Sequence, residues 1–464
     1  MGSRRNCTRS VVERTSKNMQ PVDKNIQWYQ SKFKEFEQSL NGEKSTMVHT
    51  VRRDAIRRFA QNGFPTQRQE EWRFTNISPI TKIEFQPILQ YELPETTRDD
   101  IRKYLLDGAV HAVFVNGMFS SELSDIGTLP QGVVVGSLAE TLKKHPEKVQ
   151  SFIARLVKGE ESAFTALNTA FVWDGGFISV PKDTVIDRPI QFLFIASDHE
   201  QAYAAQPRNL IVAGAKSQCK VVETYVGLAQ NIYLTNTVTE IVLGENSHLE
   251  HDKLQIENMN AFHIGTTQIQ MNAASHYTSN VISLGGSLVR NNITAVLDAE
   301  GSECTLNGLT LSTGTQIIDN HTAIDHAKPH CNSHELYKAI LDGGSKGVFN
   351  GKIFVRKDAQ KTDAKQTNKT LLLSDDATIN TKPQLEIFAD DVKCTHGATI
   401  GQLDDEQLFY LRSRGIDLAA ARDILTFAFA GDVINRITIE PLRQQVEKMI
   451  HERLDIRQTG IEEE

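Results

Sequence analysis

The segment DVKCTHGATIG, residues 391–401, carries a cysteine and a histidine two positions apart, Cys394 and His396. Side chains alternate between the two faces of a strand, so a strand here would project both residues from one face. Their α-carbons would lie about 6–7 Å apart, which allows both to bind one metal centre. Thiolate and imidazole suit zinc, iron and iron–sulfur clusters, but such sites take four donors. The pair is therefore either half of a metal site or a structural pair on a buried face.

A second group of metal-binding residue types lies in DNHTAIDHAKPHCNSHELY, residues 319–337. Four histidines and a cysteine fall within it, and they are His321, His326, His330, Cys331 and His334. Such a density is typical of a metal site. A loop whose histidines hydrogen-bond to neighbouring strands is the structural alternative, and the sequence leaves both open.

A thiol nucleophile is the third candidate, with Cys394 activated by His396 or Lys393. That chemistry needs a lowered thiol pKa and a third group that orients the base. A pair on one strand face seldom supplies this geometry, and no hydrolase motif surrounds it. The glycine-rich nucleotide motifs and the HExxH and GxSxG patterns are also absent in suitable context. We expect a protein that is not an enzyme, and any ATP would be bound by a partner.

Composition excludes several classes of partner and location. The chain has 464 residues, with 50 Lys+Arg against 58 Asp+Glu and a net charge of −8. Nothing in this balance favours nucleic acid or an anionic membrane. Five cysteines are too few and too uneven for a disulfide framework. No apolar run approaches the roughly 18 residues of a spanning helix, and the sequence predicts a cytoplasmic protein.

The middle of the chain repeats itself. Four aligned serines are separated by 30, 28 and 27 residues, and they are Ser217, Ser247, Ser275 and Ser302. An aliphatic residue stands six positions before each serine, namely Ile211, Ile241, Ile269 and Val296. Another stands nine positions after it, namely Val226, Ile256, Leu284 and Leu311. Stacked coils that share one core require such a period. A β-sandwich would not repeat the same offsets four times, so a β-helix is favoured.

We therefore expect four regions. Residues 1–45 are an extension with a first helix, 46–170 a mixed helical and β region, 171–400 the β-helix core and 401–464 a C-terminal helical domain. The local signals are a helix cap at Asp23, a helix end at Asn62–Gly63, a hairpin at Asn116–Gly117 and three final helices that begin near Asp404, Asp417 and Pro441.

The C-terminal helices are heavily apolar. The large side chains are Phe409, Leu411, Ile424, Phe427 and Phe429. They could pack on each other and on the end of the β-helix, or form a docking surface for another protein. The sequence pattern alone leaves both interpretations open.

Longer stretches carry a resemblance to a known family. PQLEIFADDVKCTHGATIGQLDDEQLFYLRSRGI (383–416) resembles the SufB/SufD family of the SUF iron–sulfur cluster assembly system, in the form typical of its SufD branch. The resemblance extends to DNHTAIDHAKPHC, GVFNGKIFVRKDAQKTDAKQTNKT, AFTALNTAFVWDGGFISVP and, more loosely, GFPTQRQEEWRFTNI. It covers nearly all of the chain beyond the first forty residues or so, which have no counterpart in it.

The resemblance implies a mainly β protein, a right-handed parallel β-helix between an N-terminal α/β region and a C-terminal helical domain. It also implies a scaffold that pairs with SufB through the end of the β-helix and binds the ATPase SufC through its C-terminal helices. His396, with Cys394 less firmly, would contribute to a transient iron–sulfur cluster shared with SufB. Phe409, Tyr410 and Arg412 are the residues we expect to contact SufC.

Further implications remain open. A reduced flavin in the complex and a homodimer in the absence of SufB are both compatible with the resemblance. The alternatives are a SufB-type subunit, a β-helix enzyme that acts on polysaccharide and a stand-alone zinc protein. The repeats show no regular row of carboxylates such as a carbohydrate-binding cleft would need.

Overall fold

The computed structural model describes residues 24–40, 46–89, 96–157 and 162–454. The helices that concern us are α1 (Lys24–Ser39), α2 (Met47–Asn62), α3 (Ser78–Thr81), α4 (Arg98–Ile101), α5 (Leu138–Lys144), α6 (Pro146–Gln150), α7 (Ala163–Ala170), α8 (Asp405–Ser413), α9 (Leu418–Ile434) and α10 (Glu440–Leu454). The strands of the first coils are β1 (Gln86–Pro87), β2 (Val110–Val115), β3 (Met118–Asp125), β4 (Val134–Ser137), β5 (Gly176–Val180), β6 (Ile190–Ala196), β7 (Tyr203–Ala205), β8 (Arg208–Ala213), β9 (Gln218–Gly227) and β10 (Tyr233–Leu243). The remaining strands are β11 (His248–Ile256), β12 (Ala261–Met271), β13 (His276–Ser283), β14 (Leu288–Leu297), β15 (Glu303–Ser312), β16 (Ile317–His326), β17 (Asn332–Leu341), β18 (Lys346–Val355), β19 (Asp363–Leu372), β20 (Thr378–Ile387) and β21 (Lys393–Gly401).

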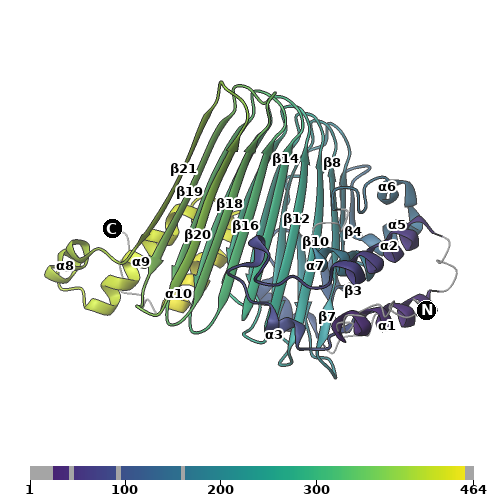
Figure 1. Cartoon of the computed structure of the whole chain (residues 1–464), viewed down its shortest axis with the longest axis horizontal. Coiled ribbons are helices and arrows are strands. Elements are labelled where there is room, and N and C mark those ends of the chain that lie inside the picture. The colour runs from purple at the N-terminus through teal and green to yellow at the C-terminus, as the bar shows by residue number, and fades with distance from the viewer. Residues whose placement is uncertain (1–23, 41–45, 90–95, 158–161, 455–464) are drawn as a thin grey trace, which may run out of the picture.

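The strands stack into two long sheets that face each other (Figure 1). Sheet A runs in the order β20-β18-β16-β14-β12-β10-β8-β5-β4, and sheet B in the order β21-β19-β17-β15-β13-β11-β9-β6-β2-β3. From β8 onward the strands alternate between the sheets and pair in parallel with the strand two positions away. Each coil therefore adds one strand to each sheet, and the predicted parallel β-helix is confirmed.

The repeated serines fix the turn from sheet A to sheet B. In each coil the serine hydroxyl donates to the carbonyl three residues earlier, at distances between 2.6 and 3.0 Å. The four serine side chains are fully buried. This short-range hydrogen bond favours a turn over a continued strand, which explains why the serine recurs in these four coils.

One predicted position in the repeat is wrong. Ile211, Ile241 and Ile269 face the interior in one register row, but the next member of that row is Ala295, so Val296 faces outward. The turn before Ser302 is one residue longer than the others, and counting back six residues therefore lands on the opposite face of the strand.

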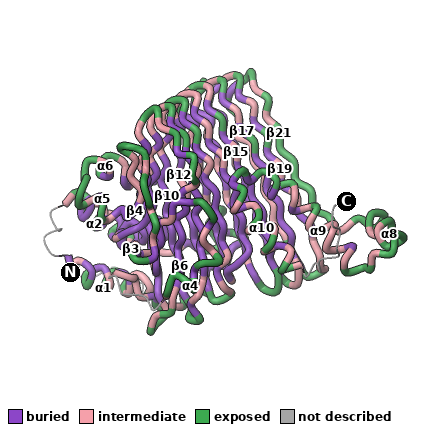
Figure 2. The backbone as a smooth tube through the Cα atoms, turned by 180° about the vertical axis from the view of Figure 1, so that it is seen from behind, coloured by how far each residue is buried: buried purple, intermediate pink, exposed green. Residues whose placement is uncertain are grey.

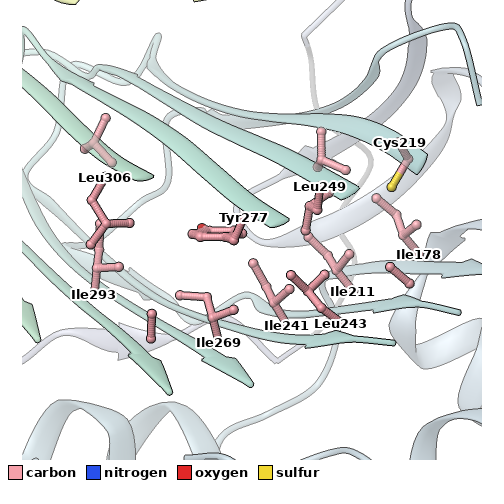
Figure 3. Close-up of a cluster of buried hydrophobic side chains, with 14 of the residues drawn as sticks. Ile178, Ile211, Cys219, Ile241, Leu243, Leu249, Ile269, Tyr277, Ile293 and Leu306 are labelled. Carbon is pink, nitrogen blue, oxygen red and sulfur yellow. The ribbon is translucent and has the colours of Figure 1, made fainter. Parts of the chain in front are cut away.

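The core between the sheets is a ladder of aliphatic and aromatic side chains (Figure 3). Ile241 and Ile269 of sheet A lie across from Leu249 and Tyr277 of sheet B. The second predicted row, which includes Leu284 and Leu311, lies outside sheet B and is covered by α9 and α10. Each coil thus contributes to two apolar layers.

The N-terminal end of the solenoid is closed. β2 and β3 form the predicted hairpin at Asn116–Gly117, and β3 and β4 end the two sheets as antiparallel edge strands. An aromatic cluster joins α1, α2 and α7 beside this end, and its members include Tyr29, Phe59 and Phe171. The helix end at Gly63 is confirmed, whereas the cap at Asp23 lies outside the described residues.

The C-terminal helices differ in how they are anchored. α9 and α10 pack on the outside of sheet B, whereas α8 projects away and buries no residue (Figure 1). The predicted caps Asp404 and Asp417 both accept backbone N–H groups of their helices. α10 begins at Glu440, so Pro441 is its second residue rather than its first. No helix in the described part of the chain has the length and apolarity that a membrane crossing requires.

Candidate functional site

Cys394 and His396 both lie on β21, the last strand of sheet B. Their register partners on β19 are Ala364 and Gln366, which are buried and face the interior. The cysteine and the histidine therefore point from the same inner face, as the strand interpretation predicted. His396 is exposed, because no further coil covers it.

The two side chains sit in different environments. Cys394 is half-buried and packs with Leu385 and Val392 against the last coils. Burial raises the pKa of its thiol, although a backbone hydrogen bond from Ala364 partly opposes this. A thiol with a raised pKa is protonated at neutral pH and must lose its proton to bind a metal. His396 carries the more available donor of the two.

The last coil exposes apolar as well as polar groups. Ile400 is 50% exposed and Phe388, in the turn between β20 and β21, is 58% exposed. An ion pair joins Asp391 of this turn to Lys361, which lies in the turn between β18 and β19 of the preceding coil. Figure 2 shows the change along the sheets, from buried strands in the middle to the exposed strand β21. The surface formed by β20, β21 and Phe388, called the terminal face below, surrounds His396.

The histidine-rich segment is not gathered into one site. His321 lies on the outer side of sheet A, with Nε2 2.9 Å from Asp319 Oδ1 and Nδ1 3.2 Å from Glu71 Oε2. His326 faces the interior, where it bonds Ser333 at 2.9 Å and burial lowers its pKa to about 4. His330 stands in a turn with φ 56°. Over the described residues, no group of three or more His, Cys, Asp or Glu side chains is placed to hold a metal ion.

His321 instead belongs to a polar cluster that fixes the segment 64–77 on sheet A. Arg290 donates to Asp319 at 2.6 Å, and its guanidinium lies 3.9 Å from the centre of the Trp72 ring. Thr75 also donates to Asp319, at 2.5 Å. A cavity of about 780 Å³ lies between this segment and the last strands of sheet A, and both His321 and Ile400 line it. These contacts give His321 a structural role, in which it helps to hold the segment 64–77 on sheet A.

The predicted partner-binding residues lie on α8. Phe409 is 74% exposed and Tyr410 is 55% exposed, and Arg412 is exposed beside them. Arg414 stacks on the Tyr410 ring, with 4.5 Å between the guanidinium carbon and the ring centre. Of the large apolar residues that the sequence singled out, Phe427 and Phe429 are partly buried against sheet B. The packing interpretation is therefore confirmed for α9, whereas docking of a partner on α8 stays a prediction.

Sequence reasoning missed two polar residues beneath His396. Glu335 on β17 and Gln366 on β19 occupy the same register row as His396, and both are buried. Their spacing along the chain, 31 and then 30 residues, matches the period of the solenoid. The serine of the earlier coils is replaced by Cys331 and Thr362 in these two, so the serine repeat gave no signal for them.

Comparisons with known proteins agree with this architecture. The family model described as "SUF system FeS cluster assembly, SufBD core domain" matches residues 194–429, and "SufBD protein N-terminal region" matches residues 23–192. An iron–sulfur cluster assembly SufBD family protein of Synechocystis is 33% identical over 89% of this chain and 92% of its own length. The Escherichia coli iron–sulfur cluster assembly protein SufD is 32% identical over 86% of this chain and 91% of its own. The chloroplast protein ABCI7 of Arabidopsis thaliana is 30% identical over 88% and 86%.

Proposed function

Because this chain belongs to the SufBD family of the SUF iron–sulfur cluster assembly system, we propose that it is a non-catalytic scaffold subunit that acts as SufD. It pairs with a SufB subunit through the terminal face. The cluster is the product assembled between the two chains, and an ATPase of the SufC type binds α8. The family match removes the polysaccharide enzyme as an alternative, and the relatives named SufD favour that branch over SufB.

The single observation that carries the proposal is the uncovered last coil. β20 and β21 are strands of ten and nine residues whose outer edges pair with no strand among the described residues. Exposed strand edges attract another strand, and native proteins usually blunt or cover them. Here the edge also carries apolar side chains at Ile400 and Phe388. Such a face suits pairing with the last coil of a related solenoid.

The chemistry of His396 also supports an intersubunit site. The inner side of the last coil offers one imidazole and one protonated thiol, fewer than the four donors that a cluster takes. A half-complete donor set binds iron weakly, and a second chain that closes on it raises the number of ligands. Cluster formation would then depend on how the two chains are held. Binding of a reduced flavin in the complex stays a prediction, as does the cytoplasmic location.

The helix α8 supports docking of the ATPase. Its exposed Phe409 and Tyr410 lie on a helix with no buried residue, so they add nothing to the buried core of this chain. The next helix, α9, is tied to sheet B, because Lys338 on β17 pairs with Asp432 and donates to the Phe429 carbonyl at 2.8 Å. A displacement of α8 by a nucleotide-driven partner would therefore reach sheet B through α9.

The test of the cluster site is His396→Ala in the reconstituted complex of this chain with its SufB and SufC partners. We expect the yield of assembled cluster to fall by about tenfold or more, while the complex stays intact in size-exclusion chromatography. Thr395→Ala is the matched control, since Thr395 is exposed on the opposite face of β21. An unchanged cluster yield in the His396→Ala complex would remove the ligand role.

The test of ATPase docking is Phe409→Ala combined with Tyr410→Ala. We expect this variant to lose SufC in a pull-down and to keep SufB. Phe388→Ala, at the terminal face, removes an exposed aromatic ring elsewhere and should keep SufC. If the double variant still recovers the ATPase at the level of the unmodified chain, the docking surface lies elsewhere.

A further inference from the structure

Three polar side chains form a row on the inner side of the last three coils, where the earlier coils place mainly apolar side chains. Glu335, Gln366 and His396 are register partners on β17, β19 and β21. Neighbouring parallel strands lie about 4.8 Å apart, so each side chain stands next to the one in the following coil. The row leads from the buried interior to the terminal face.

Glu335 is buried, and no cationic side chain among the described residues pairs with it. Its side chain accepts a hydrogen bond from Gln366 Nε2 at 2.7 Å, and burial raises its pKa to about 7 although hydrogen bonds with Thr322 and Gln366 oppose this. The other titratable groups that feel its charge are Tyr337 and Cys304, and both are neutral when protonated. The Gln366 amide is therefore its main polar contact on the side of the terminal face.

The amide of Gln366 has one end occupied and one end free. Its Nε2 donates to Glu335, while its buried Oε1 has no hydrogen-bond partner in the part of the chain that the structure describes. A buried carbonyl oxygen without a donor costs about 1–3 kcal/mol, so the position favours any donor that can reach it. The next side chain in the row is His396, whose ring carries an N–H.

We propose that Gln366, held in orientation by Glu335, positions His396 by accepting the N–H of one imidazole nitrogen. The other ring nitrogen then has a free lone pair and faces the uncovered end, where a metal ligand must face. This inference rests on the proposed function of His396. Histidine ligands in metal sites are commonly fixed in this way, because the hydrogen bond at one nitrogen selects which nitrogen binds the metal.

The direction of the hydrogen bonds gives each residue a distinct role. His396 donates to Gln366, and Gln366 donates to ionised Glu335. A protonated Glu335 would instead donate to the amide oxygen, which turns the amide and offers Nε2 to the imidazole. The ring nitrogen next to Gln366 would then accept this N–H. The other ring nitrogen, which faces the uncovered end, would carry the proton and have no free lone pair for a metal. Glu335 and Gln366 are therefore positioning residues, and neither touches the cluster.

The experiment measures which imidazole nitrogen of His396 carries the proton. The full chain is labelled with ¹⁵N-histidine and studied by NMR at about pH 8.5, above the range in which histidine usually titrates. The His396 signals are assigned by their loss in His396→Asn. We expect the unmodified chain to hold one tautomer, and both Gln366→Met and Glu335→Met to give a mixture of the two.

Two further variants separate positioning from a structural role. Asn368→Leu is the matched control, because Asn368 is buried on the same face of β19 and its register partner is Ala398 rather than a histidine. It should destabilise the coil and leave the tautomer of His396 unchanged. In the double swap Glu335→Gln with Gln366→Glu, the amide at position 335 donates to the carboxylate at position 366, and that carboxylate can accept the N–H of His396. The double swap should therefore restore the single tautomer. Thermal unfolding of each variant identifies any that do not fold.

The outcomes separate this inference from the proposed function. An unchanged tautomer in Gln366→Met, or a mixture that the double swap fails to correct, overturns the positioning role. A shifted tautomer supports it whatever the cluster yield. In the complex we expect Gln366→Met to lower the cluster yield by about tenfold. A shifted tautomer with an unchanged yield would instead refute His396 as a ligand.

Discussion

The two ends of the solenoid are built in opposite ways. At the N-terminal end the sheets stop with the antiparallel strands β3 and β4, of eight and four residues, beside a cluster of buried aromatic side chains from α1, α2 and α7. At the C-terminal end they stop with two long parallel strands, and neither β20 nor β21 has a buried residue. The N-terminal end therefore keeps buried side chains up to its last strands, whereas β20 and β21 at the other end have none.

This difference indicates which end of the solenoid is stabilised by packing within the chain and which end is open to a partner. A solenoid needs caps at both ends, because each coil is stabilised by its neighbours. A chain that caps only one end relies on a partner for the other. The pair Cys394 and His396 lies at the uncapped end, so the proposed cluster site and the proposed subunit pairing would share one face.

The largest expected effect compares one phenylalanine from each end. Phe59 is fully buried against Tyr29 and Phe64, whereas Phe388 is 58% exposed. Phe59→Ala should lower the free energy of unfolding by about 3–5 kcal/mol, and Phe388→Ala by less than about 1 kcal/mol. Urea denaturation of the isolated chain measures both. Equal losses would mean that the two ends are equally packed.

The sequence predicted the middle of the molecule better than its ends. A serine turn recurs in four successive coils, and an inward isoleucine in the first three of them, because each coil meets similar neighbours, so the period alone reveals Ile211, Ile241 and Ile269. It failed at Val296, where one extra turn residue shifts the face. At the candidate site it predicted that Cys394 and His396 share a face, since that follows from strand alternation.

Contacts between segments far apart in the chain could not be predicted from the sequence. Lys338 meets α9 more than ninety positions along the chain, and no local pattern marks that pairing. The position of His321 next to Glu71 likewise depends on how the segment 64–77 crosses sheet A. The row from Glu335 to His396 was predictable in principle, because register in a solenoid follows the coil length.

The second prediction concerns hydrogen exchange at the two ends. In the isolated chain we expect the outer backbone amides of β21 to exchange quickly, since they pair with no strand in the described structure, and those of β2 to exchange slowly. Saturating SufB should slow exchange in β21 by about 100- to 1,000-fold and leave β2 unchanged. Protection of β21 in a monodisperse monomer would contradict an uncovered edge. In a homodimer the same protection would assign the terminal face to self-association.

The last prediction compares two buried glutamates at different depths of the solenoid. Glu223, deep in the stack, has its pKa lowered to about 2, because its hydrogen bond and charge contact with His251 outweigh the effect of burial. Glu335, near the open end, has its pKa raised from 4.5 to about 7 by burial. Between about pH 4.5 and 7 the native protein holds a proton at Glu335 that the unfolded chain has released. This contribution to stability is therefore present at low pH and is lost as the pH rises through 7.

Each glutamate should leave its own sign in the pH dependence of unfolding. At pH 8, Glu335→Gln should recover a share of the roughly 3 kcal/mol that ionisation of the buried carboxyl costs, and its advantage over the unmodified chain should vanish by about pH 4.5. Glu223→Gln should be destabilising at pH 8, because the ionised carboxylate is the stabilising form there. That loss should shrink as the pH falls below 4.5. If denaturation curves from pH 4.5 to 8 show the same sign for both variants, the carboxyl of Glu335 is as well compensated by its surroundings as that of Glu223.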